Sequence, residues 1–206
     1  MKILKMLSFA LSLSLFILAS CATTTLTSTW KDPSYDGGKL KKILVVGVTK
    51  KPAMKRIFED EFVAQLRVKG LDGVASYTVM PQDEAPDKNA LTALVNKLGV
   101  DGVIVTRLVD KKTIETYYPP QVTYVPNPGY YGGWYSYYYP SYSYVTTPGY
   151  TTENQVIVLE TNLYAANGEK LVWSGISETF VEDTANQLIK GFVQVIIRDI
   201  SEKGLI

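Results

Sequence analysis

The chain has 206 residues, of which 46% are hydrophobic and 20% charged, and its formal net charge is +1. This composition is typical of one folded domain and not of a disordered chain. The near-neutral charge provides no basic field for nucleic acid. The sequence contains no histidine and one cysteine, which excludes an internal disulfide, a multi-cysteine metal site and histidine acid–base chemistry. We therefore expect no cofactor and no enzymatic activity.

Residues 1–20 predict a secretory signal peptide. Lys2 and Lys5 precede an apolar run over residues 6–18, and small residues come just before Cys21. A positive start followed by a short apolar run and small residues is typical of a cleaved signal. The run is too short to cross about 30 Å of hydrocarbon comfortably as a helix.

Leu18-Ala19-Ser20-Cys21 resembles a bacterial lipobox at all four positions. The resemblance implies that residues 1–20 are removed and that Cys21 receives acyl chains, palmitate among them, which hold the protein on a membrane. Residue 22 is alanine and not aspartate, and if the cell has two membranes the sorting rule of such lipoproteins implies the outer one, with the protein facing the periplasm. The alternative is an ordinary secreted protein with an incidental cysteine.

Strands and helices are expected to alternate after this anchor. Residues 22–38 are rich in Thr, Ser, Gly and Pro and predict a tether, partly ordered near Trp30. Residues 41–49 form a β-branched apolar run that predicts a buried strand. Pro52 opens a helix to about Lys69, where Gly70 ends it. Its predicted core face consists of Met54, Ile57, Phe58, Phe62 and Leu66.

A second strand and a second helix are predicted next. Residues 75–81 alternate weakly and predict a strand that ends at Pro81. Asp87 is placed to cap a helix that Gly99 ends. The predicted core face of this helix consists of Leu91, Leu94, Val95 and Leu98.

The last part of the domain predicts a meander and a closing helix. Strands are expected over residues 101–118, 155–165 and 169–180, and Asn167-Gly168 predicts a hairpin between the last two. Thr184 and Gln187 have capping-box spacing at the start of a helix. Its apolar face consists of Leu188, Phe192, Val195, Ile196 and Ile200.

The resulting order is βαβαβββα. It predicts an α/β (α+β) fold with a single mixed sheet of about five strands and helices mainly on one face. The domain spans residues 39–206, after the acylated cysteine and tether of residues 21–38. It carries a long irregular insertion rich in Tyr, Pro and Gly over residues 117–152, between two neighbouring strands.

Two stretches resemble known lipoproteins. Leu98-Gly99-Val100-Asp101-Gly102 resembles the helix–strand junction in the small α/β domain of penicillin-binding-protein activators and of the curli secretion channel subunit. Residues 164–175, ending in Lys170-Leu171-Val172-Trp173-Ser174-Gly175, resemble a hairpin of an uncharacterised bacterial envelope lipoprotein family. The resemblance covers about residues 40–200 without the insertion and implies no catalytic residue. The six prolines in residues 119–150 depart from the long strands of the curli channel's hairpins.

The insertion contains twelve of the fifteen tyrosines and no charged residue. An apolar ring with a polar hydroxyl favours interfaces, so the segment predicts contacts with sugars of an envelope polymer, with lipid headgroups or with a protein partner. The alternative is a disordered insertion with no selected contact. The candidate binding residues are Tyr130, Tyr131, Trp134, Tyr135, Tyr137, Tyr138, Tyr139, Tyr142 and Tyr144.

Other candidate chemistry is expected to be structural. Glu59-Asp60-Glu61 predicts a solvated helix face, because adjacent helical residues do not face one another. Gly47 to Lys51 lacks the spacing of a phosphate loop. Arg107 and Glu115 are each placed either to pair with a neighbouring strand or to lie on a solvated face, and Trp173 predicts core packing.

Two functions from different classes follow from these patterns, and a third has little support. The preferred hypothesis is a non-enzymatic, lipid-anchored cell-envelope protein that binds a protein partner or an envelope polymer through the insertion. The second is an accessory subunit of an envelope assembly or secretion complex that binds through the α/β domain. The third, a hydrolase, requires a cleft with converging polar groups.

Overall fold

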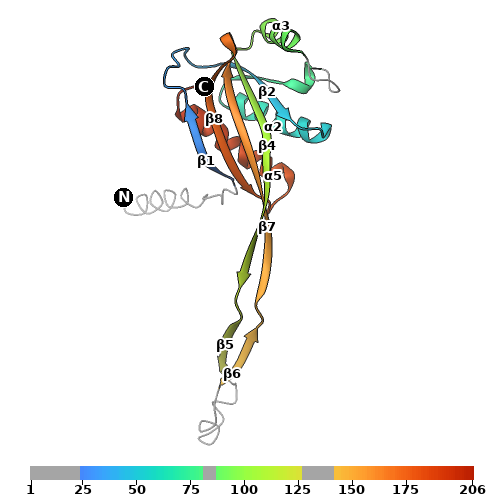
Figure 1. Cartoon of the computed structure of the whole chain (residues 1–206), viewed down its shortest axis with the longest axis vertical. Coiled ribbons are helices and arrows are strands. Elements are labelled where there is room, and N and C mark those ends of the chain that lie inside the picture. Colours follow the sequence, from blue (N-terminus) through green and yellow to red (C-terminus); the bar gives the residue numbers. More distant parts are fainter. Residues whose placement is uncertain (1–23, 81–86, 127–141) are drawn as a thin grey trace, which may run out of the picture.

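The computed structural model describes residues 24–80, 87–126 and 142–206. A six-stranded mixed sheet has the order β1-β8-β7-β4-β2-β3, and β5 and β6 form a separate two-stranded ladder (Figure 1). The predicted α+β class is confirmed. The strands are β1 (Thr24–Lys31), β2 (Lys42–Val48), β3 (Asp72–Ala75), β4 (Gly102–Tyr118), β5 (Gln121–Pro126), β6 (Tyr142–Thr147), β7 (Tyr150–Ala165) and β8 (Lys170–Phe180). The helices are α2 (Pro52–Val68), α3 (Lys88–Leu98) and α5 (Ala185–Glu202), with short 3-10 turns at η1 (Ser76–Thr78) and η3 (Asn167–Glu169).

The hydrophobic core lies between one face of the sheet and the helices α2 and α5 (Figure 1). Side chains from the two helices meet in an aromatic cluster, in which the ring centroids of Phe62 and Phe192 are 6.1 Å apart. Each fully buried side chain of this size contributes about 1.5–3 kcal/mol. The sheet side of the core is supplied by Ile43, Val45, Ile104, Leu163, Val172 and Trp173. None of the helices in the described ranges is long and apolar enough to cross a membrane.

Helix α2 begins at Pro52, where the missing N–H of proline leaves no helical hydrogen bond unmade. Phe62 and Leu66 are fully buried, as the four-residue spacing predicted. The prediction was wrong for Met54 and Ile57, which are exposed. They lie in the first turns of the helix, where the apolar stripe extends past its packing partners.

Helix α5 is predicted accurately by its apolar stripe, since all five predicted core residues are buried. Its start departs from an ideal capping box. The hydroxyl of Thr184 donates to the side-chain oxygen of Gln187 at 2.6 Å, and no side chain caps the backbone there.

The second strand of the prediction is misplaced. The strand is β3, which ends at Ala75, and the chain then turns through η1. Gly73 explains the position, because a Cβ there would lie 3.1 Å from the Cα of Val63 in α2. The glycine therefore lets a short edge strand approach the helix closely.

The predicted tether is also corrected over residues 24–31. They form β1, which pairs antiparallel with β8, so that Thr24 lies opposite Thr179 and Trp30 opposite Ser174. The Thr24 and Thr179 hydroxyls are 2.9 Å apart and buried. Threonine favours strands, and here the pairing partner is far away in sequence.

The hairpin between β7 and β8 is confirmed. The last pair is Ala165 with Lys170, so the connection has four residues and is longer than the two-residue Asn-Gly turn; positive φ falls at Gly168 (80°) and Glu169 (52°). Trp173 is fully buried, as predicted, and its indole N–H donates to Asp199 of α5 at 2.8 Å. Gly175 lies against this ring, where a Cβ would come within 2.7 Å of the indole Cζ2.

Candidate functional site

Strands β4 and β7 extend well beyond the sheet that they share with β2 and β8 (Figure 1). Strand β2 ends beside Arg107 of β4, and β8 ends beside Val156 of β7. Beyond these points β4 and β7 pair only with each other in the described part of the chain, out to Tyr118 opposite Tyr150. We name residues 113–126 and 142–155 the hairpin arm.

The arm contains two ladders with a break between them. Strand β5 pairs antiparallel with β6, from Gln121 opposite Thr147 to Pro126 opposite Tyr142. The break falls between Tyr118 and Gln121 on one side and at Gly149 on the other. A Cβ at Gly149 would lie 2.8 Å from the Pro120 ring and 2.9 Å from the Tyr118 carbonyl oxygen. The close approach of the two chain segments at the break therefore requires glycine.

The insertion was expected to be irregular, and its described residues correct this prediction. Proline opposes a strand only where it would interrupt the ladder. Pro119, Pro120 and Pro148 lie in the break between the two ladders, and Pro126 is the last residue of β5. The prolines thus bound the strands of the arm and do not disrupt them.

The surface of the arm is apolar, aromatic and nearly uncharged. No charged residue occurs from 116 to 152. Tyr117 is 65% and Tyr150 55% exposed, and the rings of Tyr118 and Tyr150 stack with centroids 4.9 Å apart. A two-stranded ribbon is marginally stable in water, since neither face is covered. A partner that covers this surface would therefore stabilise the arm.

We name the domain without the arm the body, and two ion pairs join neighbouring strands of the body close to where the arm begins. Arg107 of β4 donates through Nε to Glu160 of β7 at 2.7 Å, so the predicted cross-strand pairing of Arg107 is confirmed. Lys112 donates to Glu178 of β8 at 2.7 Å, and this carboxylate raises the pKa of the lysine.

Of the two predicted environments of Glu115, the solvated face is the one observed. Glu115 lies directly opposite Glu153 in the β4–β7 ladder, and both side chains are exposed. Like charges directly opposite one another destabilise a ladder slightly. The pair marks the outer limit of charge on the arm.

The predicted binding residues are only partly placed. Cys21 and the seven aromatic residues from Tyr130 to Tyr139 lie outside the described residues. Tyr142 and Tyr144 belong to β6, where they lie opposite Pro126 and Tyr124. The described structure therefore places these two at the far ladder of the arm and leaves the others as predictions.

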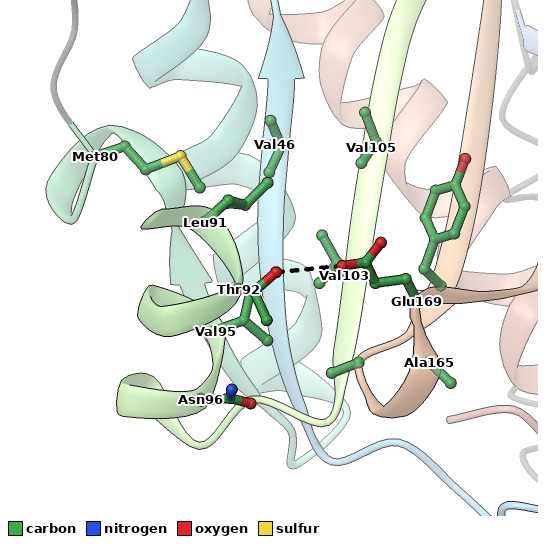
Figure 2. Close-up of a pocket in the computed structure, with 12 residues that line it drawn as sticks. Val46, Met80, Leu91, Thr92, Val95, Asn96, Val103, Val105, Ala165 and Glu169 are labelled. Atoms are coloured by element: carbon green, nitrogen blue, oxygen red, sulfur yellow. Dashed lines mark hydrogen bonds between the residues drawn. The ribbon is translucent and has the colours of Figure 1, made fainter. Parts of the chain in front are cut away.

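A cavity of about 440 Å³ lies between α3 and the sheet face opposite α2 and α5 (Figure 2). Leu91 and Val95 of α3 line one wall, so the predicted core face of this helix is corrected. It has no buried residue and faces a cavity. The opposite wall is formed by Val46, Val103, Val105 and Tyr164.

The two ends of α3 are as predicted. Asp87 accepts from the Ala90 N–H at 2.9 Å, and Gly99 is left-handed.

The prediction that Glu59 lies on a solvated helix face was wrong, because its side chain is fully buried. Its carboxylate accepts hydrogen bonds from the Gly47 N–H at 2.9 Å, the Ser76 hydroxyl at 2.6 Å and the Tyr77 N–H at 2.9 Å. These donors lie on β2 and η1, so Glu59 joins three elements. Because every donor is a fixed part of the fold, the arrangement is structural.

Two further carboxylates hold the chain together near the β7–β8 turn. Asp101 accepts from the backbone N–H groups of Lys41 and Lys42 at 2.8–3.0 Å, so it ties the start of β4 to the start of β2. Asp32 is buried and lies 2.7 Å from the Nζ of Lys170. The hydrogen bond from Lys170, followed by those from Ser34, lowers the pKa of Asp32 to about 2.

Comparisons with known proteins give structural likeness without sequence relatives. No family model and no curated protein matches the chain. The PelC dodecamer of Paraburkholderia phytofirmans is similar at 13% identity and a TM-score of 0.45, over 84% of this chain and 94% of that one. Lipoprotein GNA1162 of Neisseria meningitidis is similar at 14% identity and a TM-score of 0.42, over 79% of this chain and 99% of that one. At these TM-scores the likeness assigns neither a family nor a function.

Proposed function

We propose that this is a lipid-anchored protein of the bacterial cell envelope, without enzymatic activity, that binds a protein partner through the hairpin arm. The lipobox-like residues ending at Cys21 support the anchor and the envelope location, with the outer membrane following from residue 22. An acylated cysteine with two or more chains gives stable attachment.

The observation that carries the binding role is the unpaired ribbon beyond the sheet. From Thr113 to Tyr118, β4 pairs with β7 alone among the described residues, which leaves backbone N–H and C=O groups along both outer edges. Such edges accept an added strand from a partner, and exposed tyrosines supply contact area at low entropic cost. This combination favours a protein partner over an envelope polymer.

The test removes the outer arm and keeps the ladder below it. Residues 119–149 are replaced by Asn-Gly, a two-residue turn that suits the Tyr118–Tyr150 pair. Partners crosslinked in intact cells, and isolated sacculi, are recovered with the full chain and with the truncated one. We expect the protein crosslinks to disappear and the thermal unfolding of the body to stay unchanged.

A matched pair of substitutions separates the arm from general surface effects. Tyr117→Ser with Tyr150→Ser removes exposed rings from the arm, and Val68→Ser removes an 80% exposed apolar side chain from α2. Only the arm variant is expected to weaken recovery of the partner. Crosslinks that survive the truncation would reject the proposal, and loss of sacculus binding alone would identify an envelope polymer as the ligand.

The accessory-subunit hypothesis is favoured by one observation, the exposed apolar side chains on the sheet face that α3 leaves open. Trp30 is 46%, Val48 56% and Ile176 38% exposed. An interface there would survive truncation of the arm and be lost on Ile176→Asp.

A further inference from the structure

The cavity under α3 adjoins a second, polar chamber of about 560 Å³, and the two share the lining residues Asn96, Ala165 and Ala166. Each volume is within the range of small-molecule sites, about 300–1,000 Å³. We propose that this double chamber binds a single-chain amphiphile, with its aliphatic chain under α3 and a cationic head group in the polar chamber. The site belongs to the body, so the inference does not depend on the function proposed for the arm.

The shape and chemistry of the first chamber fit an aliphatic chain. Figure 2 shows Leu91 and Val95 of α3 on one side and Val46, Val103 and Val105 of the sheet on the other. Most of the lining is aliphatic, and the polar residues Thr92 and Glu169 are hydrogen-bonded to each other. Such walls favour a chain of methylene groups, since each buried CH₂ contributes about 0.8 kcal/mol.

Glu169 marks the boundary between the apolar wall and the turn. Its carboxylate accepts from the Thr92 hydroxyl at 3.2 Å and lies 3.4 Å from the Nζ of Lys88, so it joins the β7–β8 turn to α3 (Figure 2). Its φ is 52°, and it is the only non-glycine residue with positive φ in the described chain. Holding glutamate in this conformation costs about 1–2 kcal/mol.

The charges of the polar chamber fit a cationic head group. Asp36 and Asp101 line it, and Lys170 is the only basic side chain among its described lining residues. The charge of Lys170 is already offset, because Asp32 lies 2.7 Å from its Nζ. Burial, together with the Asp101 and Asp36 carboxylates, raises the pKa of the Tyr35 hydroxyl in the same chamber, which agrees with a negative local field.

The experiment uses the full chain in envelope vesicles and a photoreactive dodecylamine with a diazirine in its alkyl chain. After irradiation, tryptic peptides are analysed by mass spectrometry. We expect saturable labelling of the α3 peptide at residues 89–97, which contains Leu91 and Val95. Excess dodecylamine should displace the label at a concentration on the order of tenfold lower than dodecanoate does.

Two variants on the same helix test the location. Val95→Trp fills the cavity and should reduce labelling about tenfold, whereas Ala93→Trp, on an exposed position outside the cavity lining, should leave it unchanged. Asp36→Asn should bring the concentrations at which dodecylamine and dodecanoate displace the label closer together. Labelling that is not saturable, that Val95→Trp and Ala93→Trp affect equally, or that dodecanoate displaces as well as the amine does would overturn the proposal. Competition by dodecylamine and dodecanoate on the unaltered chain tests the proposal even if a variant does not fold.

Discussion

The body and the hairpin arm use the same two strands, β4 and β7, in opposite ways. In the body these strands are central in the sheet, and Ile104 and Leu163 are fully buried beneath α2 and α5. In the arm they form the inner ladder by themselves, with the β5–β6 ladder beyond it, and Tyr117 and Tyr150 are mostly exposed. Burial of apolar area therefore stabilises the body, whereas no described residue gives the exposed rings of the arm comparable burial.

The body and the arm also differ in where their charged side chains lie. The body contains a fully buried carboxylate, Glu59, with three hydrogen-bond donors fixed around it. The arm has Glu115 opposite Glu153 and no charge farther out. Buried, hydrogen-bonded charge thus helps to specify the packing of the body, whereas the outer arm carries uncharged polar and aromatic side chains.

Glu59→Ala should have the largest effect on the body. It leaves the donors of Gly47, Ser76 and Tyr77 without their acceptor, and we expect a loss of about 3–4 kcal/mol in the free energy of unfolding. Urea unfolding measures it. Glu61→Ala is the matched control, which should cost less than about 0.5 kcal/mol because Glu61 contacts only Gln65 by side-chain hydrogen bond. Equal costs would show that the buried network does not stabilise the body.

Gly175→Ala should cost about 2 kcal/mol, because the added Cβ would collide with the buried Trp173 ring. Gly191→Ala in α5 is the matched control, since nothing lies within 4 Å of a Cβ at that position. The control should stabilise the protein by about 0.5–1 kcal/mol, as alanine favours a helix over glycine. Thermal unfolding of the two variants should therefore move in opposite directions, and a shared direction contradicts the packing described for the indole.

The ionised carboxylate of Asp32 should make the free energy of unfolding of the body depend on pH. Its pKa is lowered from the ordinary value of 3.8 to about 2 in the folded protein. The contribution is therefore fully present above pH ~4 and is lost as the pH falls through about 2. Urea midpoints of the unaltered chain and of Asp32→Asn should converge between these pH values, and a constant difference down to pH 2 would contradict the Lys170 contact as its cause.

The smallest effect is expected in the arm. Glu153→Lys converts a like-charge pair with Glu115 into an opposite-charge pair and should stabilise the ladder by roughly 0.2–1 kcal/mol. Amide exchange at residues 113–118 and 150–155 should slow, with no change in the core of the body. Glu182→Lys, on an exposed loop position, is the control and should leave exchange in the arm as it was.

The sequence predicted elements whose partners are close by in the chain or whose pattern is strong. The stripe from Leu188 to Ile200 gave α5, and Asn167-Gly168 gave the β7–β8 hairpin. The burial of Glu59 was missed because it depends on Gly47 and Ser76, which the fold brings to the helix from elsewhere. No local pattern carries that information.

Strand β1 and the outer ladder of the arm were missed for a different reason, although the strand over residues 101–118 was predicted. Residues 24–31 have a strand-forming composition, but their partner β8 is about 150 residues away. In the arm, Gln121 to Val125 and Tyr144 to Thr146 are rich in Val, Thr and Tyr, which favour strands. Counting prolines over the whole insertion hid this signal, because the positions of the prolines, and not their number, decide where a ladder forms.

The continuity of β4 has a mechanical consequence. Its 17 residues, Gly102 to Tyr118, span roughly 55 Å at about 3.3 Å per residue, and Val103 near the inner end lines the α3 cavity. Strand β7 runs alongside over 16 residues, from Tyr150 back to Tyr164 and Ala165 on the cavity wall. The paired strands therefore connect the exposed tyrosines of the arm to the wall of the cavity without an intervening loop. A displacement of the arm would be transmitted to that wall through the β4–β7 ladder.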